Sequence, residues 1–463
     1  MKSVPYPAYR PSGVEWLGDV PEHWDVRRLE HVASYRTSSV DKKAEEGEVA
    51  VRLCNYTDVY YQDRIRAGDG NFMEATASPR EIARFGLRVG DVLVTKDSED
   101  WQDIGVPALI EETASDFVCG YHLGIIRAHE ELDSGFLFRL MQSGSVNQQL
   151  QTSASGVTRY GLPNSSVGDA ALPIPPLTEQ RAIAAFLDRE TERIDTLVAK
   201  KRQLIERLQE YRTALITRTV TRGLPPEAAS AAGLDPSPRL KPSGFEWLGD
   251  VPEHWAVAPL YTRYSVDLGK MLKEDRTRGD HLVSYLRNVD VQWDQINFDD
   301  LPQIDIGPAE FERYTVLPGD LLVCEGGEVG RAAIVPECDE PFAYQKALHR
   351  LRPKKAENPR FMFYMLRFAV AQGIFQAGGN PNTILHLTGE MLRRYRFPQP
   401  PHEEQAVIAA FLDHEMERLD GLASEVETAI ERLQEYRTAL ITAAVTGKID
   451  VRESATTSGG PAA

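Results

Sequence analysis

The sequence predicts an α+β protein in which two mixed, mainly β domains are separated by two long helices that pack together as a coiled coil. Three observations support this prediction. The stretch ERLQEYRTALIT at residues 206–217 recurs letter for letter at residues 431–442. A tryptophan-rich segment at residues 10–24 returns with few changes at residues 241–255. The blocks between these repeats differ strongly, so the chain is an internal duplication that carries one diverged domain in each half.

Each half begins with a tryptophan arm that shares the letters WLGDVPEHW. Proline and glycine between the aromatic residues favour turns. An indole ring can stack on a nucleic-acid base or pack against its own domain, and we favour packing. The histidine in each arm has no partner at a catalytic spacing, so it is interpreted as structural as well. The arm residues with this interpretation are Trp16, Trp24, Trp247, Trp255, His23 and His254.

The two diverged blocks contain short β-branched runs separated by Gly, Pro, Asn and Asp, a pattern typical of a mixed, mainly β domain. Residues 87–94 (LRVGDVLV) resemble residues 316–323 (VLPGDLLV), where a turn leads into a strand. The blocks are therefore expected to be related domains. The expected boundaries are 1–24 for the first arm, 25–174 for the first domain, 175–222 for the first helix, 223–255 for a linker and the second arm, 256–399 for the second domain, 400–446 for the second helix and 447–463 for the tail.

The helices have clear start signals and a heptad pattern. Pro-Pro ends the extended segment before each one, and Thr-Glu-Gln or Glu-Glu-Gln then places acidic side chains in the first turn. Leu, Ala, Glu, Arg and Gln dominate both copies, and a helix from 178 to 219 would be roughly 60 Å long. Apolar residues at heptad spacing indicate a coiled coil rather than one helix in a globular core. They include Leu187, Ile194, Leu208 and Leu215, and Leu412, Leu419, Val426, Leu433 and Leu440, with a second row at Leu197, Leu204, Tyr211, Leu422, Ala429 and Tyr436.

The sequence contains no motif of an enzyme or of a cofactor site. The glycines at residues 326–330 (GGEVG) lack the lysine and hydroxyl of a phosphate-binding loop, and no dinucleotide fingerprint, HExxH or GxSxG is present. Four scattered cysteines without a CxxC indicate reduced thiols rather than zinc ligands. No run of eighteen apolar residues and no apolar signal region occurs, so we expect a cytoplasmic protein. Because the enzyme motifs are absent, we also expect the protein to be non-catalytic.

Near-identical helices would hold the two diverged domains at a fixed separation. Duplex DNA presents equivalent faces about every 34–36 Å, which a helix of roughly 60 Å can span. If the helices pack antiparallel, the duplication also creates a pseudo-two-fold axis. Two equivalent surfaces would then be available to two copies of one partner.

The order of these motifs resembles the specificity subunit of type I restriction-modification systems over essentially the whole chain. The residues that carry the resemblance are the two WLGDVPEHW arms, the helix starts PPLTEQ and PPHEEQ, and the segment VTGKIDVR near the end. The resemblance implies that the two domains are target-recognition domains, each reading half of a split site in double-stranded DNA. It also implies an antiparallel coiled coil with internal pseudo-two-fold symmetry, which sets the spacer between the half-sites.

The same resemblance implies the partners. Two methylation subunits are expected to dock on the helices, and restriction subunits to join the complex. No cofactor is expected in this chain, whereas S-adenosylmethionine, ATP and Mg are expected on the partner subunits. Two alternatives stay open, namely the recognition subunit of a modification-only assembly and a coiled-coil adaptor that binds proteins without DNA specificity.

The net charge of −17 is unusual for a protein that binds phosphates. We therefore expect local basic stripes on the domains and further DNA contacts from partner subunits. Polar loops beside glycine precede the last strand of each domain, and Arg and Asn there can contact guanine and adenine edges. A surface or hairpin role is the alternative for each candidate. The candidate DNA-binding residues are Asn55, Lys96, Arg159 and Tyr160 in the first domain, and Arg287, Asn288, Lys346, Asn380, Asn382 and Thr383 in the second.

Overall fold

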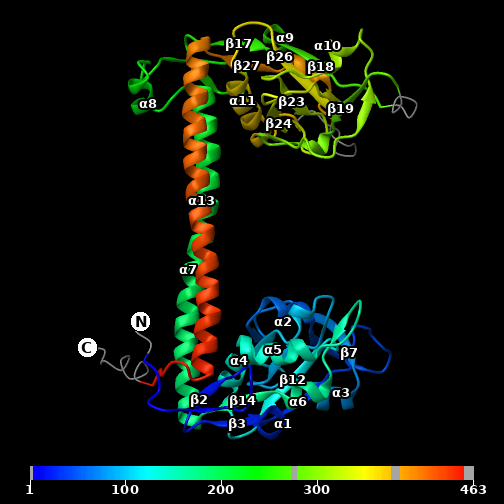
Figure 1. The fold of residues 1–463 in the computed structure, drawn as a ribbon, viewed down its shortest axis with the longest axis vertical. Coiled ribbons are helices and arrows are strands. Elements are labelled where there is room, and N and C mark those ends of the chain that lie inside the picture. The colour runs from blue at the N-terminus through cyan, green and yellow to red at the C-terminus, as the bar shows by residue number, and fades with distance from the viewer. Residues whose placement is uncertain (1–3, 273–278, 377–385, 453–463) are drawn as a thin grey trace. The chain divides into compact units, whose positions relative to one another are not determined.

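The computed structural model describes residues 4–272, 279–376 and 386–452 of the chain. Two compact units divide it, residues 1–201 with 427–463 as unit 1 and residues 202–426 as unit 2. Each unit contains one mixed α/β module and a part of both long helices, α7 (Leu177–Arg222) and α13 (His402–Val445) (Figure 1). Within the described ranges, no helix is both long and apolar enough to cross a membrane.

The module of unit 1 is built on two sheets that share one apolar core. The larger sheet has the order β4-β12-β8-β10-β6, and the smaller one has the order β11-β5-β7. Leu93 and Ile125 from the larger sheet and Leu53 and Phe117 from the smaller one are fully buried in this core. The strands of unit 1 are β1 (Tyr9–Pro11), β2 (Asp19–Pro21), β3 (Asp25–Arg28), β4 (Ala33–Thr37), β5 (Val49–Cys54), β6 (Arg64–Arg66), β7 (Met73–Ala77), β8 (Val92–Thr95), β9 (Asp97–Ser98), β10 (Pro107–Glu112), β11 (Phe117–Cys119), β12 (Leu123–Ala128), β13 (Tyr160–Gly161) and β14 (Ala171–Ile174).

Helix α4 connects this sheet to the long helices. Its first turn is capped by Asp133, whose carboxylate accepts a hydrogen bond from the Phe136 N–H at 3.0 Å. Figure 1 shows α4 between the paired long helices and the strands of the module, and Arg139 of α4 donates to Asp188 of α7 at 2.8 Å. The helices of this module are α1 (Leu29–Val32), α2 (Tyr56–Tyr61), α3 (Pro79–Phe85), α4 (Ser134–Gln142), α5 (Gly144–Ser153) and α6 (Asn164–Asp169), with a short 3-10 helix at Trp101–Asp103.

The module of unit 2 repeats this plan, as the sequence predicts. Its sheets have the orders β18-β26-β23-β24 and β22-β19-β25, which follow β4-β12-β8-β10 and β7-β5-β11 of unit 1. The strands are β15 (Leu240–Pro242), β16 (Asp250–Pro252), β17 (Ala256–Pro259), β18 (Tyr264–Leu268), β19 (Leu282–Leu286), β20 (Val291–Gln292), β21 (Gln295–Ile296), β22 (Gln303–Asp305), β23 (Leu321–Cys324), β24 (Ala332–Ile334), β25 (Ala343–Tyr344), β26 (Leu348–Pro353) and β27 (Arg396–Gln399).

The segment expected as a linker contains a helix. Residues 226–231 form α8 (Pro226–Ala231) because Pro226 occupies its first turn, where a missing N–H costs nothing, and alanines follow. The other helices of unit 2 are α9 (Leu260–Arg263), α10 (Phe311–Tyr314), α11 (Pro359–Ala371) and α12 (Gly389–Arg394), with a 3-10 helix at Asn288–Asp290.

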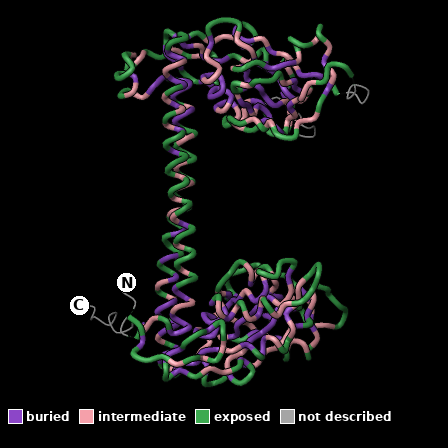
Figure 2. The backbone as a smooth tube through the Cα atoms, viewed as in Figure 1, coloured by how far each residue is buried: buried purple, intermediate pink, exposed green. Residues whose placement is uncertain are grey.

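The long helices pack antiparallel along one heptad row. Asp195 of α7 lies opposite Arg437 of α13, and Arg212 of α7 lies opposite Asp420 of α13, so numbering rises on one helix as it falls on the other. Leu187, Ile194, Leu215, Leu412, Leu419 and Leu440 are buried. The expectation that a second row is also covered is wrong for most of its members, since Leu197, Leu204, Tyr211, Leu422 and Tyr436 are exposed. Figure 2 shows exposed residues along the helices and buried ones inside each module.

Each tryptophan arm is fastened to the first turn of the long helix that follows its module. Trp24 is fully buried, and its Nε1 donates to Oε1 of Glu179 at 3.1 Å, while Nε2 of His23 lies 2.9 Å from the other carboxylate oxygen. Unit 2 repeats the arrangement at 3.0 and 2.9 Å with the residues Trp255, His254 and Glu404. The structural interpretation of these residues is confirmed. Trp16, however, is 39% exposed and is not a buried anchor.

Both ends of each module lie side by side. Strand β3 pairs antiparallel with β14, and β17 pairs antiparallel with β27, so the first and last strands of a module form a two-stranded sheet. The chain thus enters and leaves each module at one place, directly beside the arm and the helix start.

Candidate nucleic-acid interface

In unit 1, the ends of β5, β8 and β11 meet beside the loop that contains β13. The N–H of Gly120 donates to the carbonyl oxygen of Cys54 at 2.8 Å. The N–H of Lys96 donates to the carbonyl oxygen of His122 at 3.1 Å, and the N–H of Leu162 donates to that of Lys96 at 2.7 Å. These backbone bonds bring together the residues that directly follow three strands.

One carboxylate orders the basic side chains at this place. Oδ2 of Asp97 accepts from Nζ of Lys96 at 3.0 Å, and its Oδ1 lies 2.6 Å from Nδ1 of His122 and 2.7 Å from an Nη of Arg159. Burial raises the pKa of Asp97, but the hydrogen bonds and charges of Lys96 and His122 outweigh burial and hold that pKa below its usual value. Asp97 therefore stays ionised at neutral pH and keeps three nitrogen-bearing side chains next to one another.

The structure brings together all four candidates of the first domain. Lys96 and Arg159 share Asp97, and Tyr160 pairs with Ser98 in the β13–β9 ladder. Asn55 directly precedes α2, and its side-chain oxygen lies against Gly120, where an added Cβ would approach it to 3.0 Å. That these residues bind DNA stays a prediction.

Sequence reasoning missed several members of this cluster. The ring of Tyr121 lies 3.6 Å from that of His122, and the rings of Tyr56 and Tyr60 are stacked at 5.6 Å. Asp97 was missed as well, because its importance depends on loops far apart in the chain. One signal was available, namely an aromatic residue and a histidine placed directly after the buried strand β11 and Gly120.

Unit 2 contains the same backbone frame. The N–H of Gln345 donates to the carbonyl oxygen of Leu286 at 3.0 Å. The N–H of Glu325 donates to the carbonyl oxygen of Ala347 at 2.9 Å, and the N–H of Leu387 donates to that of Glu325 at 2.8 Å. Each bond has its counterpart in unit 1, so positions in the two modules can be matched residue by residue.

The match also pairs the residues that directly follow strands β5 and β19. The N–H of Asn55 donates to the Asp58 carboxylate at 2.7 Å, and the N–H of Arg287 donates to the Asp290 carboxylate at 2.7 Å. Arg287, and not Asn288, therefore occupies the place of Asn55.

The second-domain candidates are held in different ways. Arg287 donates two bonds to Asp290, at 2.8 and 2.7 Å, and Nδ2 of Asn288 donates to the carbonyl oxygen of Gly326 at 3.0 Å. Lys346 is exposed and occupies the place of Tyr121 rather than that of Lys96. Three further candidates, Asn380, Asn382 and Thr383, lie outside the described residues.

A family model described as the type I restriction modification DNA specificity domain matches residues 21–207 and 281–432. Each match takes in most of one module and part of the long helix that follows it. The chain belongs to this family. The two matched regions correspond to the two halves of the internal duplication.

Members of this family that the chain resembles come from bacteria and archaea. The putative type I restriction enzyme MjaX specificity subunit of Methanocaldococcus jannaschii is 21% identical over 94% of this chain and 96% of that protein. The type I restriction enzyme EcoKI specificity subunit of Escherichia coli strain K12 is 20% identical over 93% of this chain and 90% of its own length. The match with the EcoBI specificity subunit of Escherichia coli, at 24% identity, spans 65% of this chain and 63% of that relative.

Solved structures share the fold of this family member. A chain from a study of complex assembly and conformational transition of the type I R-M system has a TM-score of 0.67 at 18% identity, covering 93% of this chain and 99% of its own. The HsdS subunit from Thermoanaerobacter tengcongensis has a TM-score of 0.56 at 17% identity, covering 93% and 98%. The two-module fold with long helices is therefore confirmed.

Proposed function

We propose that this chain is the DNA sequence-specificity subunit of a type I restriction-modification complex and reads a bipartite double-stranded site with one module per half-site. The observation that carries the proposal is a repeated backbone frame with different side chains. The same hydrogen bonds join the ends of three strands in both modules, but Asn55 and Lys96 in one are replaced by Arg287 and Glu325 in the other. Equivalent backbones dock on DNA alike, whereas different side chains read different bases.

The clustered side chains of unit 1 have the chemistry for base reading. Arg159 is 54% exposed at its side chain and carries donors that match the O6 and N7 acceptors of guanine. Asn55 can pair with adenine, and Asp97 can accept from the amino group of cytosine. Lys96 supplies a charge for a backbone phosphate.

The docking of partners has support on the long helices. A groove of about 770 Å³ in unit 1 and one of about 720 Å³ in unit 2 are lined by the two copies of the repeated stretch. Because the matched linings are identical, one kind of partner fits both, which agrees with two methylation subunits per chain. The shared lining residues are Gln434, Glu435, Thr438, Ala439 and Thr442 in unit 1, and Gln209, Glu210, Thr213, Ala214 and Thr217 in unit 2.

In this proposal, the chain supplies recognition and its partners supply catalysis. Methylation subunits bind S-adenosylmethionine, and restriction subunits bind ATP and Mg²⁺. Partner subunits also provide much of the contact with DNA phosphates, because the net charge of −17 opposes phosphate binding by the chain alone.

The proposal is tested by mapping methylated adenines across the genome of a host that carries the chain and of the same host without it. We expect one bipartite motif to be methylated only when the chain is present. Identical maps would contradict the proposed function. A cleavage assay on unmodified DNA then shows whether restriction subunits act with the complex.

A further inference from the structure

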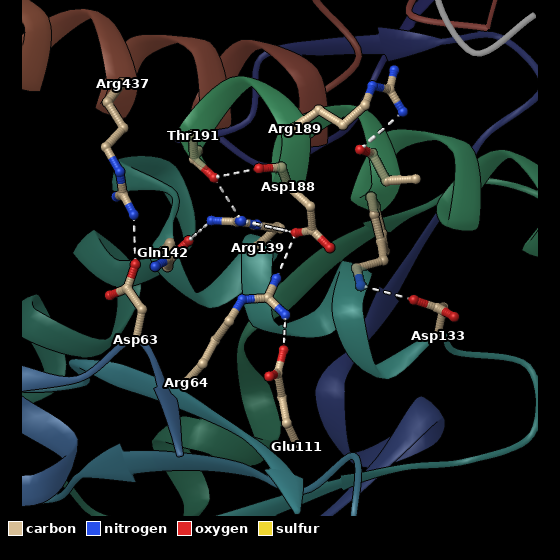
Figure 3. Close-up of polar contacts among 12 residues, drawn as sticks. Asp63, Arg64, Glu111, Asp133, Arg139, Gln142, Asp188, Arg189, Thr191 and Arg437 are labelled. Carbon is tan, nitrogen blue, oxygen red and sulfur yellow. Dashed lines mark hydrogen bonds and ion pairs between the residues drawn. The ribbon is translucent and has the colours of Figure 1, made fainter. Parts of the chain in front are cut away.

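An aspartate at the same position of each long helix anchors the neighbouring module. Asp188 and Asp413 both end the letters AFLD in the duplicated helices. In unit 1, Oδ1 of Asp188 accepts from Arg139 at 2.8 Å and from Arg64 at 2.6 Å (Figure 3). In unit 2, Asp413 accepts from two side chains of α11, at 2.6 Å each, and these are Tyr364 and Arg360.

The arginines of unit 1 extend this anchor into a network. Arg139, from α4, also donates to Thr191 of α7 at 2.8 Å, and Arg64, from β6, also donates to Glu111 of β10. Arg437 approaches from α13 and contacts both Asp63 of the module and Asp195 of α7, the latter at 3.1 Å. Figure 3 shows these side chains converging from the sheet, from α4 and from both long helices.

Charged bonds add to the apolar packing at this joint, where Phe138 of α4 and Leu187 of α7 are fully buried. A cavity of about 640 Å³ beside it is lined mainly by polar and charged groups, Asp188, Arg139 and Arg437 among them. Arg139 is only 2% exposed; burial lowers the pKa of its guanidinium, and the bond to Asp188 opposes that effect. The side chain of Asp188 is 42% exposed, but its loss leaves the buried Arg139 without its counter-charge. Two nitrogens of Arg139 and one of Arg64 donate to the same Oδ1, and charge-assisted hydrogen bonds of this kind restrict the orientation of the groups they join.

We propose that Asp188 is a positioning residue that sets the angle of the unit 1 module on its helices and thereby determines how strictly the complex discriminates spacer length. This inference rests on the proposed function. The base-reading candidates belong to a different cluster, which is centred on Asp97. Loosening the joint therefore leaves the half-site readable but widens the range of spacers over which both half-sites can be engaged.

The test uses the complex assembled with its methylation partner. Methylation rates are measured on duplexes with the native spacer, with a spacer one base pair longer or shorter, and with one changed base in the half-site read by unit 1. For Asp188→Asn, we expect the ratio of native to altered-spacer rates to fall about tenfold, the effect of losing about one charge-assisted hydrogen bond. The ratio of native to changed-base rates stays within about twofold, because distant independent sites are additive.

The matched control is Asp169→Asn, an exposed carboxylate of the same module that pairs with Arg28 at 3.0 Å; it should change neither ratio. If Asp188→Asn fails to assemble, Arg64→Gln replaces it, because Arg64 is partly exposed and donates to the same Oδ1 of Asp188 at 2.6 Å. That variant loses the charged bond to Asp188 and should relax the spacer ratio alone.

An unchanged spacer ratio in the variant that assembles overturns the inference, and so does an equal fall of both ratios. A wild-type complex that prefers no bipartite site would instead contradict the proposed function. The two failures are therefore distinguished by the wild-type measurement.

Discussion

Asp97 is the residue that connects the basic side chains of the unit 1 cluster. Its carboxylate holds Lys96, His122 and Arg159 in one place, although these residues come from three separate segments. A base-reading arginine that is already oriented loses less side-chain freedom when it meets DNA. Under the proposed function, the single aspartate therefore orients these candidate residues before DNA is present.

The contribution of Arg159 can be measured by Arg159→Ala. Loss of its bidentate contact should cost about 1–3 kcal/mol at one base of one half-site and leave the other half-site unchanged. Methylation of a library randomised at both half-sites measures the effect. Arg80→Ala, which removes an exposed arginine of α3 in the same module, is the control. An unchanged site preference in Arg159→Ala would remove this residue from the interface.

His349 should make the stability of unit 2 depend on pH. Its Nε2 lies 2.6 Å from the carbonyl oxygen of Leu387, and its Nδ1 is buried without a hydrogen-bond partner among the described residues. Burial lowers the pKa of His349 below 6.5, only partly opposed by that carbonyl oxygen. Below pH 6.5 the unfolded chain therefore binds the proton more readily, so stability is complete above that pH and falls as pH decreases.

Urea unfolding at pH 7.5 and at pH 5.5 tests this prediction. The wild-type chain should lose more unfolding free energy between the two pH values than His349→Gln, which cannot take up the proton. Carboxylates elsewhere contribute equally to both proteins and cancel in the comparison. An equal loss in both would show that His349 does not titrate on unfolding.

Local sequence patterns predicted where the long helices begin and end, but they did not predict which strands pair. Pro-Pro, the acidic first turn and the heptads predicted α7 and α13 within a few residues, because capping and periodicity are encoded locally. The grouping of Lys96 with His122 depends on the pairing of β5 with β11 and of β8 with β12. No short-range pattern encodes which strands pair, so the candidates could be named but their neighbours could not.

The repeated groove on the long helices makes a prediction about stoichiometry. Thr438→Arg and Thr213→Arg each place a bulky charge in one groove at an exposed position. Either variant should bind one methylation subunit where the wild type binds two, and the double variant should bind none. Native mass spectrometry of the complexes measures this number. Two bound subunits in both single variants would place the docking surface elsewhere.

Two properties of the whole chain, its internal duplication and its net charge, bear on how it can recognise DNA. Two modules with one backbone plan permit two different half-sites, whereas the repeated helices line a groove with the same residues in each unit. The acidic net charge makes DNA binding by the chain alone unfavourable, since phosphate contacts provide much of the affinity for DNA. The proposed function therefore divides recognition and affinity between this chain and its partners.

That division predicts weak DNA binding by the isolated chain. Its affinity for a duplex with the native site should rise at least about tenfold when the methylation partner is added, because the partner supplies phosphate contacts. Fluorescence anisotropy at one stated salt concentration measures both affinities. Equal affinity with and without partner would refute the prediction.

The paired first and last strands of each module have an evolutionary consequence. Because β3 lies against β14, and β17 against β27, each module is a cassette whose two ends are adjacent and are held by the same arm and helix start. Recombination can exchange such a cassette without disturbing the remainder of the fold. A population holding several variants of each cassette therefore gains new specificities as the product of their numbers rather than as the sum.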